Sequence, residues 1–358
     1  MKAALGISLL LIFCLSACIT RKGAFRGTPF ESSEQDFDQQ KLAELSNYID
    51  TAAKTTGLVV LHKGKMVYQY GDIKKVSYLA SCRKSILAML YGKYVEDGTV
   101  DLNQQIGELG IDEKDGLLPI EKKATVDHII TSRSGVFHIA SNGGYDLANF
   151  KERGSVQPGE YFVYSNWDFN VGGALFEQFT GKSIYQEMEE QFAIPLGFQD
   201  WNIKNQRKSG NTKKSQYKAY HFYLSSRDMA KLGQLMLNQG EWEGKQLISK
   251  DWVKKITTTV TPKDTVMARS SNPNPKVPAY SYGYMWWLFD EYLGDSEYEG
   301  SFSATGYGGQ YITVIPKAEL VIAHKTKLTL SAMIGLTYME TSPSVYYTII
   351  DKLMNARK

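Results

Sequence analysis

Strand patterns lie near both ends of this chain, and a long stretch of helical pattern separates them. Two β-rich runs, 57–61 and 66–70, flank a His-Lys-Gly-Lys turn and predict a hairpin. Strand patterns return only at 282–289, 310–315 and 320–324. Because a strand needs a partner, we expect one sheet built from both chain ends, with a helical insertion between them. The predicted fold class is α/β (α+β), with an antiparallel sheet flanked by helices.

Helical periodicity fills most of the remaining chain. We expect helices at 37–54, 81–96, 165–180, 183–192, 226–238, 249–257 and 343–356. The stretch 257–279 lacks such a period and is predicted to be a long loop. These patterns predict a sheet domain of 37–100 and 280–358 around a mostly helical insertion of 101–279.

The N-terminal segment has the composition of a targeting signal. Lys2, an apolar run of residues 5–13 and small residues before Cys18 indicate a signal peptide over 1–17. The run is too short for a comfortable membrane-spanning helix. Leu15-Ser16-Ala17-Cys18 resembles a bacterial lipobox, which implies that Cys18 is lipidated. The alternative is ordinary cleavage beside an incidental cysteine. Residues 18–36 are polar, lack a period and predict a tether.

We therefore expect an exported lipoprotein that a lipid anchor holds to a bacterial membrane, facing the periplasm or the cell exterior. The formal net charge of +3 is small and dispersed, so we expect no nucleic-acid partner. The three cysteines form no CxxC motif and the five histidines no HExxH motif, so we expect no metal and no cofactor. Cys82 is expected to be a small buried hydrophobic residue.

Ser81 and Lys84 form an S-x-x-K pattern at the predicted start of the helix 81–96. Residues three apart lie on one helix face, so the lysine amine can reach the serine hydroxyl. Serine is a weak nucleophile until a base takes its proton, and burial lowers a lysine pKa toward that role. The pattern is weak alone, because Ser215 and Lys218 match it too. That second copy lies in a Lys-rich polar stretch and is predicted to be solvated surface.

Two further motifs accompany the first copy. Tyr164-Ser165-Asn166 lies where a turn enters a helix, and the Gly-rich stretch 301–311 precedes and enters a strand. In this order the three motifs resemble the serine β-lactamase and penicillin-recognising superfamily. The resemblance is to the branch of class C β-lactamases, DD-peptidases, related esterases and 6-aminohexanoate-dimer hydrolase, and it implies a β-lactamase/transpeptidase-like fold. Further stretches of this branch are 126–135, 195–198, 225–233 and 282–287.

The resemblance implies a role for each motif residue. Ser81 is the acyl-accepting nucleophile, and Lys84 accepts or organises its proton. Tyr164 is a phenol or phenolate that activates Ser81 or protonates the leaving group. Asn166 binds Lys84 or a substrate amide.

Substrate is expected to lie along the edge strand at Thr305, Gly306 and Tyr307. The implied oxyanion hole is formed by the backbone N–H groups of Ser81 and Tyr307. The alternative to these roles is a helix cap at Ser81, a surface lysine and a core tyrosine. His138 and His221 are candidates for the pocket lining, with ordinary packing as the alternative. Of Trp286 and Trp287, one ring is expected in the core and the other on the cleft wall.

The third motif departs from the family pattern, because Ala304 stands where a lysine or histidine is usual. The cation that meets a β-lactam or peptide carboxylate is therefore missing. We expect a serine hydrolase that cleaves a small-molecule carboxylic ester, amide or peptide through an acyl-enzyme. The alternatives are a DD-peptidase or weak class C-like β-lactamase, and a non-catalytic lipoprotein binding module.

Overall fold

The computed structural model describes residues 28–33, 35–143, 147–269, 279–289, 296–326, 328 and 340–358. The predicted signal peptide, Cys18 and part of the predicted tether lie outside the described residues. In the part of the chain that the structure describes, none of the helices combines the length and apolarity needed to cross a membrane.

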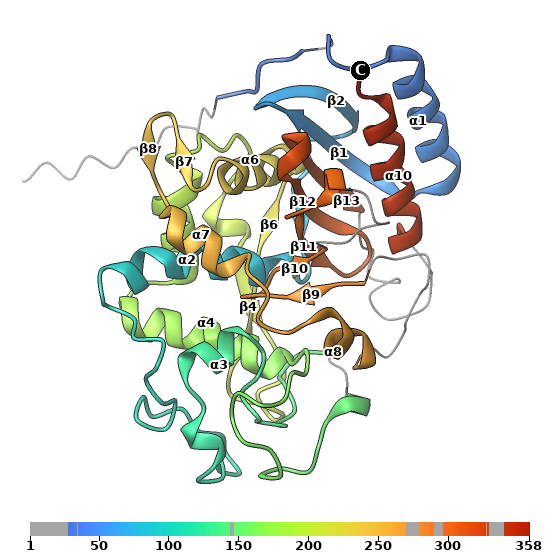
Figure 1. Cartoon of the computed structure of the whole chain (residues 1–358). Helices are drawn as coiled ribbons and strands as arrows, with labels where there is room; N and C mark the ends of the chain where they lie inside the picture. The colour runs from blue at the N-terminus through green and yellow to red at the C-terminus, as the bar shows by residue number, and fades with distance from the viewer. Residues whose placement is uncertain are drawn as a thin grey trace, which may run out of the picture.

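A seven-stranded antiparallel sheet forms one side of the molecule, with strand order β2-β1-β13-β12-β11-β10-β9 (Figure 1). The pairing of β1 with β13 joins the two chain ends, which confirms the predicted fold class. The strands are β1 (Thr55–His62), β2 (Lys65–Gly71), β9 (Ser281–Tyr282), β10 (Trp287–Leu288), β11 (Phe302–Gly306), β12 (Gln310–Ile315) and β13 (Leu320–Thr326).

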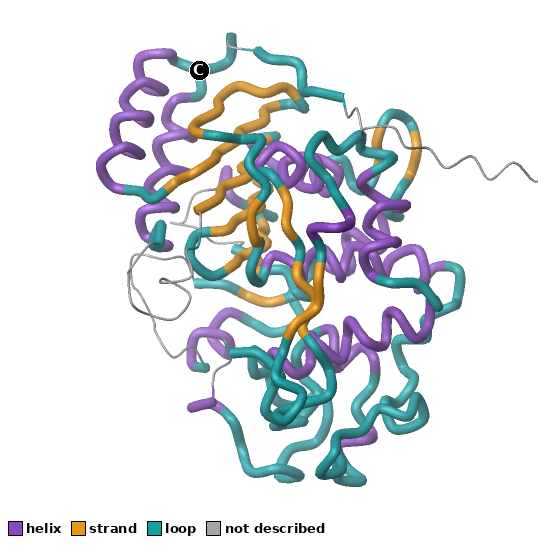
Figure 2. The backbone as a smooth tube through the Cα atoms, turned by 180° about the vertical axis from the view of Figure 1, so that it is seen from behind, coloured by secondary structure: helices purple, strands orange, loops and turns teal. Residues whose placement is uncertain are grey.

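Each face of this sheet is covered by helices. Alternate residues of β1 enter different apolar clusters, with Leu58 and Val60 on one face and Val59 and Leu61 on the other. The first face packs against α1 (Gln39–Ala52) and α10 (Pro343–Ala356), which lie side by side in Figure 2. The second face packs against α6 (Ser226–Leu237) and the start of α2 (Cys82–Glu96). Burying each such aliphatic side chain is worth about 1.5–3 kcal/mol.

The helical side of the molecule is built around α2 and α4, which contact each other. Its helices are α3 (Val126–Ile130), α4 (Asn166–Thr180), α5 (Ile184–Met188), the π-turn η3 (Glu189–Ala193), α7 (Lys250–Ile256) and α8 (Lys263–Ala268). Short 3₁₀ turns are η1 (Glu121–Lys123), η2 (Leu147–Asn149), η4 (Ile203–Asn205), η6 (Ser296–Tyr298) and η7 (Pro316–Ala318). The short strands are β3 (Ser77–Tyr78), β4 (Arg207–Ser209), β5 (Ala219–His221), β6 (Tyr223–Leu224), β7 (Glu241–Trp242) and β8 (Lys245–Gln246).

Two predicted elements differ from the structure. The strand expected at 282–289 is split into β9 and β10, because Met285 adopts φ 61° and Gly283 N donates to the Trp286 carbonyl at 3.0 Å. The loop expected at 257–279 contains α8, which begins after Pro262 and buries Val266. Proline is favoured at a helix start because its φ suits the first turn. Residues 270–278 of that stretch lie outside the described residues.

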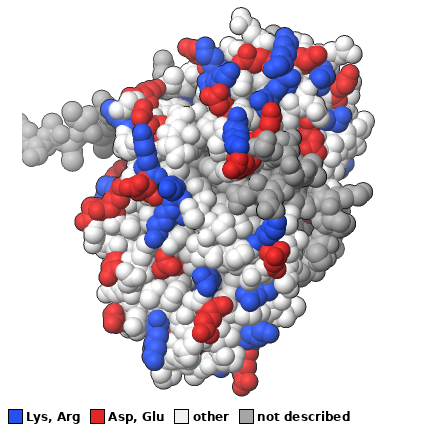
Figure 3. All heavy atoms as spheres, viewed as in Figure 1, with Lys and Arg blue, Asp and Glu red and all other residues white. Residues whose placement is uncertain are grey.

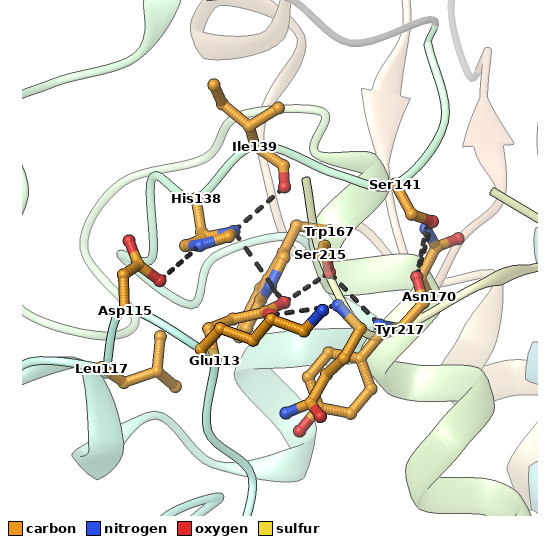
Figure 4. A network of polar contacts seen from close by, with 12 residues as sticks. Glu113, Asp115, Leu117, His138, Ile139, Ser141, Trp167, Asn170, Ser215 and Tyr217 are labelled. Carbon is orange, nitrogen blue, oxygen red and sulfur yellow. Dashed lines mark hydrogen bonds and ion pairs between the residues drawn. The ribbon is translucent and has the colours of Figure 1, made fainter. Parts of the chain in front are cut away.

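The second S-x-x-K copy also differs from its prediction, because Ser215 is buried rather than solvated. Its hydroxyl donates to the buried carboxylate of Glu113, which also accepts from Trp167 Nε1 at 2.8 Å (Figure 4). Gln216 N donates to the other Glu113 oxygen at 3.1 Å. The glutamate thereby fixes the segment that leads into β5. His138 packs beside this network and does not line the cleft described below.

Candidate active site

Ser81 lies at the N-cap position of α2, where the chain turns sharply. The preceding residue, Ala80, has φ 49°, a left-handed conformation that a non-glycine residue adopts only when its surroundings enforce it. The helix that follows is buried on nearly every side. Ser81 itself is half-buried and opens into a cleft of about 700 Å³. This residue is therefore held rigidly at the surface of a cavity.

Lys84 lies one turn further along α2 and is only 1% exposed. Its Nζ donates to the Tyr164 hydroxyl at 2.8 Å. The amine also lies 4.0 Å from the Tyr164 ring centroid and 4.2 Å from that of Phe169. Burial, followed by the neighbouring charge of Arg83, lowers the Lys84 pKa well below its ordinary value. Lys84 thus gives up its proton more readily than an exposed lysine does, which is what a base at this position requires.

Tyr164 connects Lys84 to Ser81. Burial raises its pKa to about 12, while a hydrogen bond with Ser81 and the charge of Arg83 act in the opposite direction. At neutral pH this residue is a phenol, and of the two expected forms the phenolate is disfavoured. A phenol between the serine hydroxyl and the lysine amine can accept one proton as it donates another.

Ser132 fixes the segment that carries Tyr164. Its hydroxyl donates to the Val163 carbonyl at 2.7 Å and accepts from Ser165 N at 3.1 Å. Its carbonyl accepts from Val163 N at 3.2 Å. Ser132 adopts φ 59°, so a loop of unusual conformation bonds the residues on both sides of Tyr164. The sequence pattern gives no sign of this support, because the partners are 31 and 33 residues apart.

Strand β11 passes directly beside the start of α2. A Cβ atom on Gly306 would lie 2.5 Å from the Leu79 carbonyl oxygen and 3.2 Å from Cys82 Sγ, so only glycine allows this approach. Thr305 and Tyr307 line the cleft on either side of Gly306. Tyr307 is 62% exposed, and the Thr305 hydroxyl makes no hydrogen bond to a described residue.

The two amides expected to form an oxyanion hole are those of Ser81 and Tyr307. Among the described residues, no backbone carbonyl accepts a hydrogen bond from the amides of Ser81 or Tyr307. Ala304 is fully buried in the core cluster that includes α2, so its methyl group contributes no cation to the cleft. The oxyanion hole itself stays a prediction.

Asn166, the last residue of the Y-x-N motif, also lines the cleft. Its Nδ2 donates to the Gly143 carbonyl at 2.6 Å. No hydrogen bond between described residues joins it to Lys84. The amide thus ties the start of α4 to the loop at 141–143 and contributes a polar wall to the cleft.

Aromatic rings form the opposite wall. Trp287 lines the cleft, with its ring centroid 5.3 Å from that of Tyr164, whereas Trp286 is 1% exposed in the core. This confirms the predicted division of the two tryptophans. Cys82 is fully buried and donates to the Gln310 carbonyl at 3.2 Å, and burial raises its pKa to about 12. It is the small buried residue that was expected.

Some cleft residues carried no signal in the sequence. Tyr78 comes from the short strand β3 and Arg83 from α2, next to Lys84. His221, which was only a candidate, lines the cleft from β5. A cavity of similar size, about 720 Å³, is lined by Phe30, Lys231 and Trp242 and contains none of the three motifs. The residues that line the cleft, and not its volume, therefore identify the candidate site.

Charges of both signs are mixed on the face of the molecule that Figure 3 shows. Lysine and arginine are interspersed there with aspartate and glutamate. The structure reveals no group of three or more His, Cys, Asp or Glu side chains suited to a metal ion within its described residues.

Solved structures with this fold are numerous and distant in sequence. A Bacillus anthracis protein assigned as a 6-aminohexanoate-dimer hydrolase matches with a TM-score of 0.66 and 22% identity, covering 92% of this chain and 88% of its own. The hydrolase EstCE1, which has promiscuous acyltransferase activity, matches with a TM-score of 0.61 and 13% identity over 88% and 98% of the chains. A penicillin-binding protein homologue from Caulobacter crescentus has a TM-score of 0.61 and 13% identity over 92% and 99%.

Sequence comparison gives the same grouping. An uncharacterized protein of Alkalihalophilus pseudofirmus is 23% identical over 264 residues, which are 68% of this chain and 71% of that protein. The Beta-lactamase family model matches residues 39–330, a range that includes all three motifs of the cleft. The chain therefore belongs to the Beta-lactamase family.

Proposed function

We propose that this protein is a serine hydrolase that cleaves a carboxylic ester or an amide through an acyl-enzyme on Ser81. The observation that carries the proposal is the buried Lys84 amine, hydrogen-bonded at 2.8 Å to a Tyr164 phenol that itself contacts Ser81. A lysine without a carboxylate partner, buried beside a serine at a cleft, is costly to maintain unless its neutral form is used.

The proposed reaction has two halves. Ser81 Oγ attacks the carbonyl carbon, and its proton passes to Lys84, directly or through the Tyr164 hydroxyl. The C–O or C–N bond then breaks, and the leaving group takes that proton as the acyl-serine forms. Water attacks the acyl-serine in the second half, which releases the acid and returns a proton to Ser81. Each backbone N–H of the oxyanion hole is worth about 3 kcal/mol in the transition state.

Two observations favour an ester or amide over a β-lactam or D-Ala-D-Ala peptide. Ala304 is fully buried and leaves the third motif without its cation. Proteins with this fold include EstCE1, a hydrolase with promiscuous acyltransferase activity, and the Bacillus anthracis protein assigned as a 6-aminohexanoate-dimer hydrolase. The open aromatic wall at Trp287 suits an apolar acyl group.

The test is covalent labelling combined with turnover. A fluorophosphonate probe is expected to modify one serine, and mass spectrometry should place the adduct on the peptide that contains Ser81. The same protein is expected to hydrolyse p-nitrophenyl acetate with a burst of p-nitrophenol. Labelling elsewhere, or turnover that survives Ser81→Ala, would contradict the proposal. Complete resistance to the probe, without turnover, would favour a binding module.

Fluorescent penicillin tests the alternative of cell-wall chemistry. A band that depends on Ser81 and a D-Ala-D-Ala peptidase activity would favour a DD-peptidase, and release of penicilloate would favour a β-lactamase. We expect neither, because no third-motif cation is present to bind the carboxylate that both substrates carry.

We also propose that the protein is anchored to the outside of a bacterial membrane by a lipid on Cys18. The support is the Leu-Ser-Ala-Cys pattern after an apolar run. Metabolic labelling with an alkyne fatty acid is expected to mark the wild-type protein and not Cys18→Ser. Equal labelling of both would contradict the anchor.

A further inference from the structure

Arg83 is a buried cation in the wall of the catalytic cleft. Its side chain is 2% exposed and lines the same cavity as Ser81. Nη2 donates to Asn170 Oδ1 at 3.1 Å, and the guanidinium carbon lies 4.4 Å from the Tyr220 ring centroid. The other nitrogen, Nη1, is buried and makes no hydrogen bond. Within the described residues, no acidic side chain forms an ion pair with Arg83.

This arrangement leaves a charge incompletely compensated. A neutral amide and an aromatic face stabilise a guanidinium less than a carboxylate does. Burial of a cation without a counter-ion is costly, and such a cost persists in a fold when the group serves a ligand. The free Nη1 is the atom from which a bidentate contact to an anion could be completed.

His221 presents a second unpartnered nitrogen in the same cleft. It is 8% exposed on β5, and its Nε2 is 2.7 Å from Ser209 Oγ. The Nδ1 atom is buried and makes no hydrogen bond. Burial, followed by the charges of Arg83 and Arg207, lowers the His221 pKa to about 4, so the ring is neutral at pH 7. If Ser209 donates to Nε2, the ring carries its proton on Nδ1, where it is a donor.

The orientation of Arg83 is fixed through Asn170, which Figure 4 shows beside Ser141. Asn170 Nδ2 donates to Asn142 Oδ1 at 2.8 Å and to the Tyr217 carbonyl at 3.3 Å, which turns Asn170 Oδ1 toward Arg83. Ser141 Oγ also donates to the Tyr217 carbonyl, at 2.7 Å. The arginine is therefore pre-organised, as a binding group needs to be.

We propose that Arg83 and His221 form a subsite for a carboxylate group of the substrate, so that the preferred substrate is an ester or amide that also carries an anion. The inference rests on the proposed function of Ser81. The cation comes from α2 rather than from β11, so it does not restore the missing third-motif charge. Glu340 also lines the cleft, next to α10, and forms no ion pair with Arg83.

Matched substrates test the subsite. One pair is p-nitrophenyl heptanoate and mono-p-nitrophenyl heptanedioate, which place the carboxylate on the acyl side. The other is phenyl acetate and 4-acetoxybenzoate, which place it on the leaving group. After division by the hydroxide-catalysed rate of each ester, wild-type kcat/KM is expected to favour the anionic member of one pair by about tenfold or more, the range of one charge-assisted hydrogen bond.

Variants assign the preference to Arg83. Arg83→Met is expected to abolish it, Arg83→Lys to retain part of it, and His221→Gln to reduce it. Lys213→Met removes an exposed cation outside the cleft lining and is expected to keep the full preference. A wild-type protein that favours the anionic ester in neither pair would contradict the proposed subsite. So would an Arg83→Met variant that slows both members equally, because Arg83 then acts only through Lys84.

Direct binding separates this inference from the proposed function. Saturation-transfer NMR is expected to detect benzoate, and not benzamide, on the wild-type protein, with loss of the benzoate signal in Arg83→Met. This result would keep the subsite even if no ester were hydrolysed. A folded wild-type protein that binds neither compound and shows no anionic preference would overturn the subsite while leaving Ser81 chemistry intact.

Discussion

The same four-residue pattern occurs twice in this chain, and the two copies have different environments. Ser81 lies at the start of a helix, and its Lys84 is buried against Tyr164 at the edge of a cleft. Ser215 lies in a loop, donates to the buried Glu113, and is followed by an exposed Lys218.

The comparison shows that the four-residue pattern alone does not determine the geometry, the burial or the neighbours of its serine and lysine. A helix start places positions i and i+3 on one face, whereas a loop gives no such geometry. Burial lowers the Lys84 pKa, whereas Lys218 is exposed. The supporting residues, such as Tyr164 and Gly306, come from other parts of the chain and exist only beside the first copy.

The largest expected contrast is between the two serines. Ser81→Ala should lower kcat/KM for p-nitrophenyl acetate by at least about 10³-fold, since loss of a serine nucleophile costs up to about 10⁶. Ser215→Ala should keep the wild-type rate in the folded fraction. Steady-state kinetics with active-site titration measure both. An equal decrease of kcat/KM in both variants would contradict the assignment of different roles to Ser81 and Ser215.

The two lysines should differ nearly as much. Lys84→Met removes the proton acceptor and should lower kcat/KM by about 10²–10⁴-fold. The variant should remain folded, because an apolar side chain suits a buried position, and its thermal midpoint provides the control. Lys218→Met changes an exposed side chain and should leave both rate and midpoint unchanged. A normal rate in Lys84→Met would assign the base elsewhere.

The pH profile sharpens the assignment of the base. A lysine amine accepts a proton only when neutral, so kcat/KM should rise about tenfold per pH unit below the Lys84 pKa. Because burial lowers that pKa, the plateau should begin well below pH 10.5. If the Tyr164 phenolate were the base, the rise would continue toward its pKa of about 12. Buffer-corrected rates of an activated ester from pH 5 to 10 distinguish the two.

The smallest effect should be on stability, at the second copy. Ser215→Ala leaves a buried Glu113 oxygen short of one donor and should lower the free energy of unfolding by about 1–3 kcal/mol. Lys218→Ala should change it by less than about 0.5 kcal/mol, as exposed substitutions do. Urea denaturation compares the two. An unchanged Ser215→Ala protein would mean that the Glu113 network contributes little to the fold.

The local sequence pattern was sufficient to predict those helices and strands whose apolar residues recur at the spacing of the element. Strands β1 and β13 were predicted from their apolar runs. The helix after Ser81 was predicted from its apolar-rich stretch. The order of these runs then predicted a sheet made from both chain ends. The resemblance of the three motifs to the β-lactamase superfamily, rather than local pattern, predicted that they share one site.

Tertiary contacts determined the rest. Met285 breaks the strand predicted at 282–289 with a positive φ that its residue type does not suggest. Ser215 is buried because Glu113, 102 residues away, accepts its hydrogen bond. Arg83 is a cleft residue through contacts with Asn170 and Tyr220, which no spacing rule connects to it.

The pairing of β1 with β13 has a consequence for how the enzyme comes into being. A ribosome adds about 5–20 residues per second from the N-terminus, so Ser81 emerges well before β11 and β13. The β1–β13 pair cannot form in that interval, and Gly306 cannot yet approach the start of α2 beside Ser81. Prematurely terminated chains should therefore have no activity at all, and the appearance of hydrolysis would report that synthesis has reached the final strands.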